Sequence, residues 1–174
     1  MIEIYNSNLQ GNIIIESDTL IKVHAKSTLK DIILIAPKIE IKEGFNGNLQ
    51  AFASESISIK ENCKLNYPTS LILTDNNEKG KITISKFSTI KGAIVYLKNN
   101  EKRTNFNQNI FIENTSNVYG EIYSEGNVEL RGKVLGSIFT NSFIVNYNGG
   151  TYMNHIYNGI IDSQNLTEHY AGLK

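Results

Sequence analysis

The segment Ile39-Glu40-Ile41 returns 18 residues later as Ile57-Ser58-Ile59 (39 to 57). In both segments apolar residues alternate with polar ones, which is the pattern of a strand that buries one side and exposes the other. Ile21 and Val23 stand one further step of 18 residues back (21 to 39). Strands this short cannot each bury an apolar side alone, so the spacing predicts a solenoid in which like residues stack over like.

The second half of the chain continues this ladder at less regular steps. The expected successors of Ile82 are Ile110, Val128 and Phe143, those of Ile90 are Val118, Val134 and Tyr152, and those of Ile94 are Ile122, Ile138 and Ile156. Two polar stretches, residues 75–80 and 98–105, lengthen the steps in which they fall and predict loops that leave the coil. The fold class we expect is therefore all-β: a right-handed parallel β-helix (β-solenoid) of about seven or eight coils.

We expect residues 1–161 to form the parallel β-helix and residues 162–174 to form a C-terminal capping segment. The alternation stops after Ile161, and Leu166, Tyr170 and Leu173 are the apolar residues expected to cover the last coil. A β-sandwich is the competing fold, because it also consists of short strands. It needs antiparallel hairpins, however, and the Asn-Gly pairs at 46–47, 148–149 and 158–159 all fall where the solenoid needs a corner.

The bulk composition excludes several function classes. The chain has 17 basic and 17 acidic residues and a formal net charge of zero, so it lacks the basic surface with which proteins bind nucleic acid. No apolar run is long enough to cross a membrane, and we expect no direct membrane insertion. The single cysteine, Cys63, rules out an intrachain disulfide. It replaces Ser27 and Phe45 in the ladder and is expected to be a buried, inert thiol.

The residue types that carry catalysis or bind metals do not share positions in the repeat. Paired carboxylates that cleave sugars, and His or Cys ligands of a metal, have to lie close together. The residues concerned are Asp18, Asp31, Asp75, Asp162, His24, His155 and His169. Because they fall in different parts of different coils, we expect no enzyme activity, no catalytic, cofactor-binding or metal-binding residues, and no cofactor.

Aromatic residues supply the candidate site. Tyr123 and Phe139 each follow an inward-facing isoleucine, so alternation turns both rings outward. Tyr157 follows Ile156 in the same way. The three rings are expected to form an exposed aromatic column, which can stack on sugars or bury itself in a protein partner. The alternative is that the two long loops cover the column.

Two segments with a glycine at the corner, Gly120-Glu121-Ile122-Tyr123 and Gly136-Ser137-Ile138-Phe139, resemble coils of bactofilins and related polymer-forming proteins. Residues 31–41 (DIILIAPKIEI) and 152–156 (YMNHI) are similar to β-helical C-terminal parts of uncharacterised Bacteroidetes proteins, which themselves resemble pseudopilin-like or surface-anchored proteins with an N-terminal membrane segment. The resemblance implies a parallel β-helix and no assigned catalytic residues. The two long loops and the capping segment depart from a bactofilin and argue against end-to-end polymerisation.

Together these features predict a non-catalytic structural or interaction module that belongs to a bacterial cell-surface or envelope-anchored protein. Its expected partners are proteins or components of the cell envelope, and association into a homo-oligomer stays open. Two alternatives to this function stand beside it. One is a carbohydrate-binding or carbohydrate-processing β-helix, and the other is a bactofilin-like cytoskeletal scaffold, which would place the protein in the cytoplasm.

Overall fold

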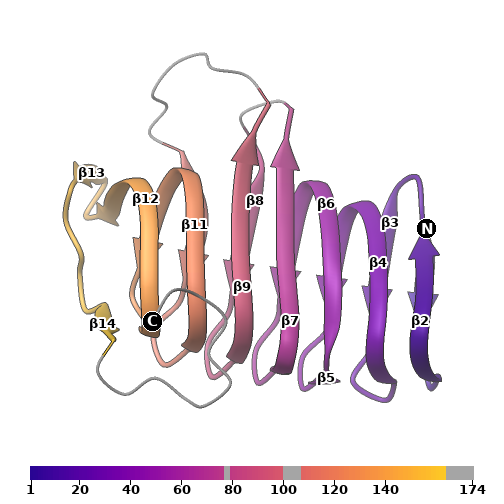
Figure 1. Cartoon of the computed structure of the whole chain (residues 1–174). Helices are drawn as coiled ribbons and strands as arrows, with labels where there is room; N and C mark the ends of the chain where they lie inside the picture. The colour runs from indigo at the N-terminus through magenta and orange to yellow at the C-terminus, as the bar shows by residue number, and fades with distance from the viewer. Residues whose placement is uncertain (77–78, 100–106, 164–174) are drawn as a thin grey trace.

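The computed structural model describes residues 1–76, 79–99 and 107–163, and these residues form strands, turns and bends without a helix (Figure 1). The strands are β1 (Ile2–Ile4), β2 (Asn8–Glu16), β3 (Leu20–Val23), β4 (Thr28–Ile41), β5 (Asn46–Gly47), β6 (Leu49–Ile59), β7 (Lys64–Asp75), β8 (Lys81–Ile84), β9 (Thr89–Lys98), β10 (Gln108–Ile112), β11 (Asn117–Leu130), β12 (Lys133–Tyr147), β13 (Gly150–Met153) and β14 (Ile160–Asp162). The chain winds through about seven turns, which confirms the predicted parallel β-solenoid.

Each coil contributes three strand segments, and like segments pair in parallel from coil to coil in three ladders. Ladder A joins β1, β3, β8 and β10 with the C-terminal parts of β4, β6, β11 and β12. Ladder B joins the N-terminal parts of β2, β4, β7, β9, β11 and β12 with β5 and β14. Ladder C joins the segments that follow ladder B in each coil, from β2 to β12. The sheet nearest the viewer in Figure 1, with the arrowheads of β7 and β9, is ladder C.

The register of ladder A confirms the columns that the sequence predicts. Its stacked residues are Ile21, Ile39, Ile57, Ile82, Ile110, Val128 and Phe143. All of them up to Val128 are buried. Because every second side chain of each coil points to the same interior, these residues form one continuous core along the solenoid.

The last coil departs from the predicted register. Val134 pairs with Ile161 of β14, and not with Tyr152 as expected. Tyr152 lies in β13, which pairs antiparallel with β12 and places Tyr152 beside Val145. The prediction that Ile156 succeeds Ile138 is wrong as well, because Ile156 lies outside the strands.

A hairpin turn causes this departure. Asn148 and Gly149 connect β12 to β13, and their φ angles are 49° and 78°. A two-residue hairpin needs this left-handed backbone, which Asn and Gly adopt at little cost. The chain therefore reverses at a position where the repeat predicts only a corner.

The last strand, β14, ends at Asp162. The residues predicted to cap the last coil, Leu166, Tyr170 and Leu173, lie outside the described residues. Within the described residues no helix has the length and apolarity needed to cross a membrane.

Three glycines stack where ladder B turns into ladder C. Gly92 pairs with Gly120, and Gly120 pairs with Gly136. Their φ angles are 147°, 148° and 153°. A Cβ at Gly120 would stand 1.9 Å from the carbonyl oxygen of Gly92, so only glycine lets the coils approach this closely. The predicted glycine corners at Gly120 and Gly136 are thus confirmed.

A second column of stacked residues, made of serines and one cysteine, lies at the corner between ladders A and B. Three of its serines donate through Oγ to a carbonyl of the preceding coil: Ser27 to Ile4 (3.0 Å), Ser88 to Lys60 (2.9 Å) and Ser116 to Ser85 (2.8 Å). Cys63 takes the same place, with Sγ 3.2 Å from the carbonyl oxygen of Lys42. The thiol is buried, as predicted, and its burial raises the pKa of Cys63.

Candidate interaction surface

Outward-facing apolar residues follow one another across ladder C. They are Ile35, Phe52, Ile72, Val95, Tyr123 and Phe139, and we call them the outer apolar column. Each is the register partner of the next, so the column crosses neighbouring strands without a gap. At the ordinary spacing of paired strands, its length is about 24 Å.

The column exists because both sides of these strands are apolar. Ile72 stands between Leu71 and Leu73, which are both buried in the core. Val95 stands between two buried residues in the same way. Since successive side chains of a strand point to opposite sides, the middle residue of each trio points outward.

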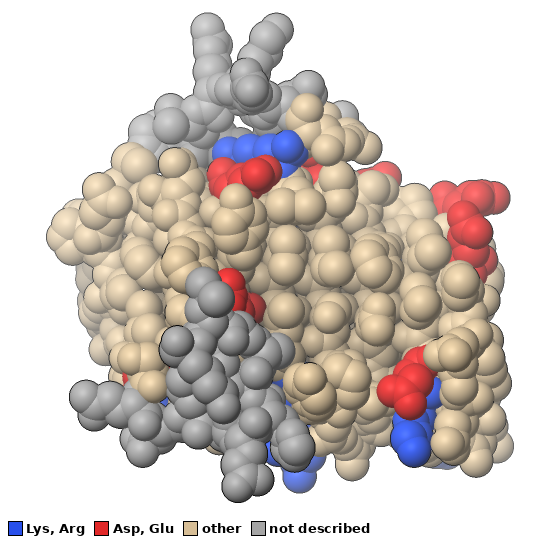
Figure 2. All heavy atoms as spheres, in the orientation of Figure 1, with Lys and Arg blue, Asp and Glu red and all other residues tan. Residues whose placement is uncertain are grey.

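The ends of the column are more exposed than its middle. Ile35, Tyr123 and Phe139 are 36%, 42% and 46% exposed, and the three residues between Ile35 and Tyr123 are partly buried. Figure 2 shows this side of the molecule: a broad area over β4, β6, β7 and β9 carries no charge, and charged side chains lie around it, with one acidic patch at mid-height on its left border. An exposed, uncharged apolar strip is typical of a surface that a ligand or partner covers.

A shallow groove of about 410 Å³ lies along the N-terminal half of the outer apolar column. Ile35, Phe52 and Ile72 belong to its lining. The polar residues that also line it are Glu16, Ser17, Asp18, Ser54 and Thr74. The groove therefore offers hydrogen-bonding groups directly beside the apolar strip.

The structure brings together two of the three aromatic residues that the sequence singles out. Tyr123 and Phe139 are direct register partners and both are exposed. Tyr157 lies elsewhere, because its ring packs against Tyr147 with the ring centroids 5.2 Å apart. Its expected place above Phe139 depended on the register of the last coil, which the β12–β13 hairpin changes.

Sequence analysis missed Ile35, Phe52, Ile72 and Val95. The signal for Ile35 and Val95 is the unbroken apolar character of residues 32–36 and 93–97, where alternation disappears because both strand sides are apolar. Phe52 and Ile72 stand in shorter apolar runs, residues 51–53 and 71–73. Such a run does not say which residues share the outer side. That assignment needs the register across the two long loops, which only the structure supplies.

The acidic residues take part in separate local contacts. Asp75 is buried and accepts hydrogen bonds from the backbone N–H of Gly80 (2.6 Å) and the hydroxyl of Tyr96 (2.7 Å). Asp31 accepts one from the side-chain amide of Asn48 (3.2 Å). Within residues 1–76, 79–99 and 107–163, no group of three or more His, Cys, Asp or Glu side chains is placed to hold a metal ion.

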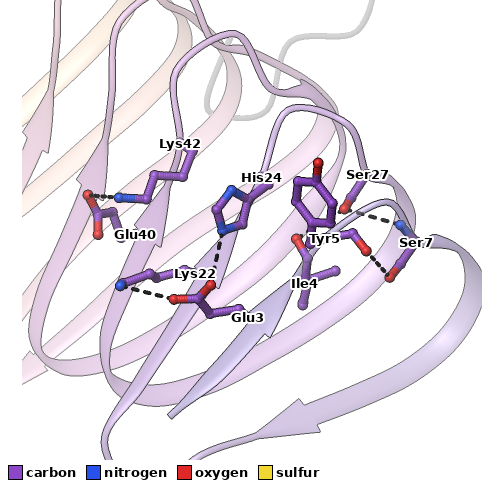
Figure 3. Close-up of polar contacts among 9 residues, drawn as sticks. All are labelled: Glu3, Ile4, Tyr5, Ser7, Lys22, His24, Ser27, Glu40 and Lys42. Atoms are coloured by element: carbon purple, nitrogen blue, oxygen red, sulfur yellow. Dashed lines mark hydrogen bonds and ion pairs between the residues drawn. The ribbon is translucent and has the colours of Figure 1, made fainter.

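Charged side chains gather outside ladder A at the N-terminal end (Figure 3). Glu3 accepts a hydrogen bond from Lys22 Nζ at 3.1 Å, and its other oxygen lies 3.5 Å from Nε2 of His24. The hydrogen bond from Lys22 is the main cause that lowers the pKa of Glu3. This cluster joins the first coil to the second. Another histidine considered as a metal ligand, His169, lies outside the described residues.

Glu40 binds lysines of two coils. Its Oε1 lies 3.0 Å from Lys42 Nζ, which Figure 3 shows, and 3.5 Å from Lys60 Nζ. Burial raises the pKa of Glu40, but the two ammonium groups together outweigh it, so the pKa is lowered overall. Contacts of this kind fasten neighbouring coils weakly, because they remain close to solvent.

A parallel β-solenoid with an apolar strip along one outer side is the class of protein that the fold and the surface define. No protein-family model, curated protein or solved structure matches this chain. What the surface does has to be argued from its own residues.

Proposed function

We propose that this chain is a structural or interaction module without catalytic activity, that it belongs to a bacterial cell-surface or envelope-anchored protein, and that the outer apolar column is its binding surface. The observation that carries the proposal is the unbroken register of this column, which runs along an uncharged area over β4, β6, β7 and β9. The location at the envelope rests on the resemblance of the coil segments to surface-anchored proteins.

The chemistry of the surface favours a protein or another envelope component as its partner. Aromatic side chains are enriched at the centres of protein interfaces, whereas charged ones are depleted there. Tyr123 and Phe139 match the first requirement, and the uncharged area over β4, β6, β7 and β9 matches the second. Because paired strands already hold these side chains in line, the side chains lose little conformational freedom when a partner covers them.

Co-sedimentation with isolated bacterial cell envelopes tests the proposal. We expect the wild-type chain to sediment with the envelopes, and the double variant Tyr123→Ser/Phe139→Ser to bind about tenfold more weakly. Tyr5→Ser is the matched control, since Tyr5 is 56% exposed but follows β1 and lies outside ladder C. Equal sedimentation of the wild type and the double variant would contradict the assignment of this surface.

Carbohydrate binding is the second candidate function, and the pairing of Tyr123 with Phe139 favours it. Two adjacent rings can stack on the apolar face of a sugar. Glu121 and Ser137, which are register partners two residues before these rings, offer groups that can bind sugar hydroxyls. Clear binding on a glycan array that Tyr123→Ala abolishes would establish this function and overturn the purely structural one.

A further inference from the structure

Polar and charged side chains gather around the ring of Phe111 on the outer side of ladder A, on a different side of the solenoid from the outer apolar column. The members of this cluster are Lys81 of β8, Gln108 and Phe111 of β10, Glu129 of β11, Arg131 and Asn146. Glu129 stands between the inward-facing Val128 and Leu130, so its side chain points outward, yet it is 0% exposed. A carboxylate buried on the outer side of a sheet needs a reason, because burial of an unpartnered charge is costly.

Three side chains satisfy this carboxylate. Arg131 Nε donates to Oε1 at 2.7 Å, and Asn146 Nδ2 donates to Oε2 at 2.9 Å. The third donor is Nε2 of Gln108, which also binds Oε2. The carboxylate therefore fixes one end of the Gln108 side-chain amide.

Lys81 fixes the other end of the same amide. Its Nζ donates to Oε1 of Gln108, while Gln108 Nε2 donates to Glu129. The opposite orientation of the amide is excluded, because an amide NH₂ cannot accept from an ammonium group and an amide oxygen cannot donate to a carboxylate. The amine nitrogen of Lys81 thus contacts the carbonyl oxygen of the Gln108 amide, while the nitrogen of the same amide contacts the carboxylate of Glu129.

Burial favours the reactive form of Lys81, whereas the face of the Phe111 ring and two nearby carboxylates favour the charged form. Its Nζ lies over the ring of Phe111, 5.5 Å from the centroid. Burial lowers the pKa of Lys81, although Glu129 and Glu113 act in the opposite direction. A lower pKa increases the fraction of uncharged amine, and only the uncharged amine is a nucleophile.

We propose that Lys81 and Gln108 become joined by an isopeptide bond, with Glu129 handing one proton to the leaving nitrogen. Nζ of Lys81 attacks Cδ of Gln108, so the Nζ–Cδ bond forms and the Cδ–Nε2 bond breaks. Once Nζ is bonded to Cδ, one proton moves from Nζ through the carboxylate of Glu129, which binds Nε2, to the leaving nitrogen, and this nitrogen departs as ammonia. Glu129 ends as it began, and the reaction consumes only the two side chains.

The fold provides what such a reaction needs, which is a nucleophile and a carbonyl held together for a long time. β8 and β10 are paired strands, with Ile82 beside Ile110, so Lys81 and Gln108 cannot drift apart while the solenoid is intact. The bond would join two successive coils through the paired strands β8 and β10. The inference is independent of the function proposed for the outer apolar column.

Intact-mass spectrometry of the purified chain tests the proposal. We expect a mass lower than that of the sequence by one ammonia, and fragmentation of a protease digest should identify a peptide in which Lys81 is linked to Gln108. Lys81→Arg keeps the positive charge but lacks the amine, and Glu129→Gln keeps the shape but lacks the base. Both are expected to restore the full mass. Lys42→Arg is the control, because Lys42 also lies on the outer side of ladder A, and this variant should keep the mass deficit.

Two results would overturn the proposal. One is a folded wild-type chain that retains its full mass after prolonged incubation above neutral pH. The other is an ammonia loss that persists in Lys81→Arg or that maps to a residue other than Gln108. Since the wild-type chain itself is measured, the outcome does not depend on whether the variants fold.

Discussion

Phe45 and Gly47 share one space inside the solenoid: a Cβ added to Gly47 would lie 2.7 Å from Cζ of the Phe45 ring. In the coils before and after, the corresponding pairs are Ser27 with Leu29 and Cys63 with Leu65, a small side chain followed by a large one. The middle coil reverses the order, so the volume of the core is conserved while its distribution changes.

This relationship predicts strong coupling between positions 45 and 47. Gly47→Leu alone should destabilise the chain by about 1–3 kcal/mol through overpacking. Phe45→Ser/Gly47→Leu, which copies the pair Ser27 and Leu29, should recover part of that loss. The recovery is only partial, because the Cβ would also stand 2.7 Å from the carbonyl oxygen of Leu29. Urea unfolding of both single variants and the double variant measures the coupling, and strictly additive effects would refute it.

The glycine column predicts a second effect on stability. Gly120→Ala should cost about 3 kcal/mol, because its Cβ would collide with the backbone of Gly92 and its φ is unfavourable for alanine. Gly150→Ala is the control, since the nearest atom to its Cβ is a side-chain carbon at 3.4 Å. A thermal melt of each variant provides the comparison. A loss for Gly150→Ala as large as that for Gly120→Ala would show that the close stacking of coils is not the cause.

The corner column predicts that Cys63→Ser is tolerated. Ser27, Ser88 and Ser116 donate to the preceding coil from the equivalent place, so a serine at position 63 can donate to the carbonyl of Lys42. We expect its stability to lie within about 1 kcal/mol of the wild type. Cys63→Ala, which loses the donor, should be the less stable of the two variants in urea, and the reverse order would contradict the role given to this column.

The thiol also predicts a dependence of stability on pH. Burial raises the pKa of Cys63 above its ordinary value of 9.0, so in alkaline solution the unfolded thiol releases its proton while the folded one keeps it. The unfolding free energy should therefore fall as the pH rises above about 9. Chemical unfolding of the wild type and Cys63→Ser across this range measures the difference. If both chains lose stability with the same slope, the thiol is not responsible.

For Glu40 we predict a loss of stability in acidic solution. Its pKa is lowered overall by Lys42 and Lys60, so its stabilising effect is present above its ordinary pKa of 4.5 and is lost as the pH falls through the lower, folded-state pKa. At neutral pH, Glu40→Gln should cost less than about 1 kcal/mol, and added salt should reduce the cost. Glu55→Gln is the control, because the Glu55–Lys38 pair is half exposed on both sides. A loss at Glu55 equal to that at Glu40 would speak against the two-lysine contact.

The solenoid and its inner columns could be predicted from the sequence because they depend on a period. Residues such as Ile21, Ile39 and Ile57 recur at a constant step, and a constant step with strand alternation has few ways to bury its apolar side. The adjacency of Tyr123 and Phe139 followed for the same reason, since no long loop lies between them. The place of Tyr157 could not be predicted, because Asn-Gly suits a solenoid corner as well as a hairpin.

The sequence by itself thus determined the class of fold, the inward columns and the exposed pair of rings. Tertiary structure decided the reversal at Asn148 and Gly149, the full outer apolar column, and the contacts of Gln108 with Lys81 and Glu129. These features depend on which strands pair across long loops. Loop length is not bound by the period, and the register of such pairs is set by the burial and hydrogen bonding of the whole stack.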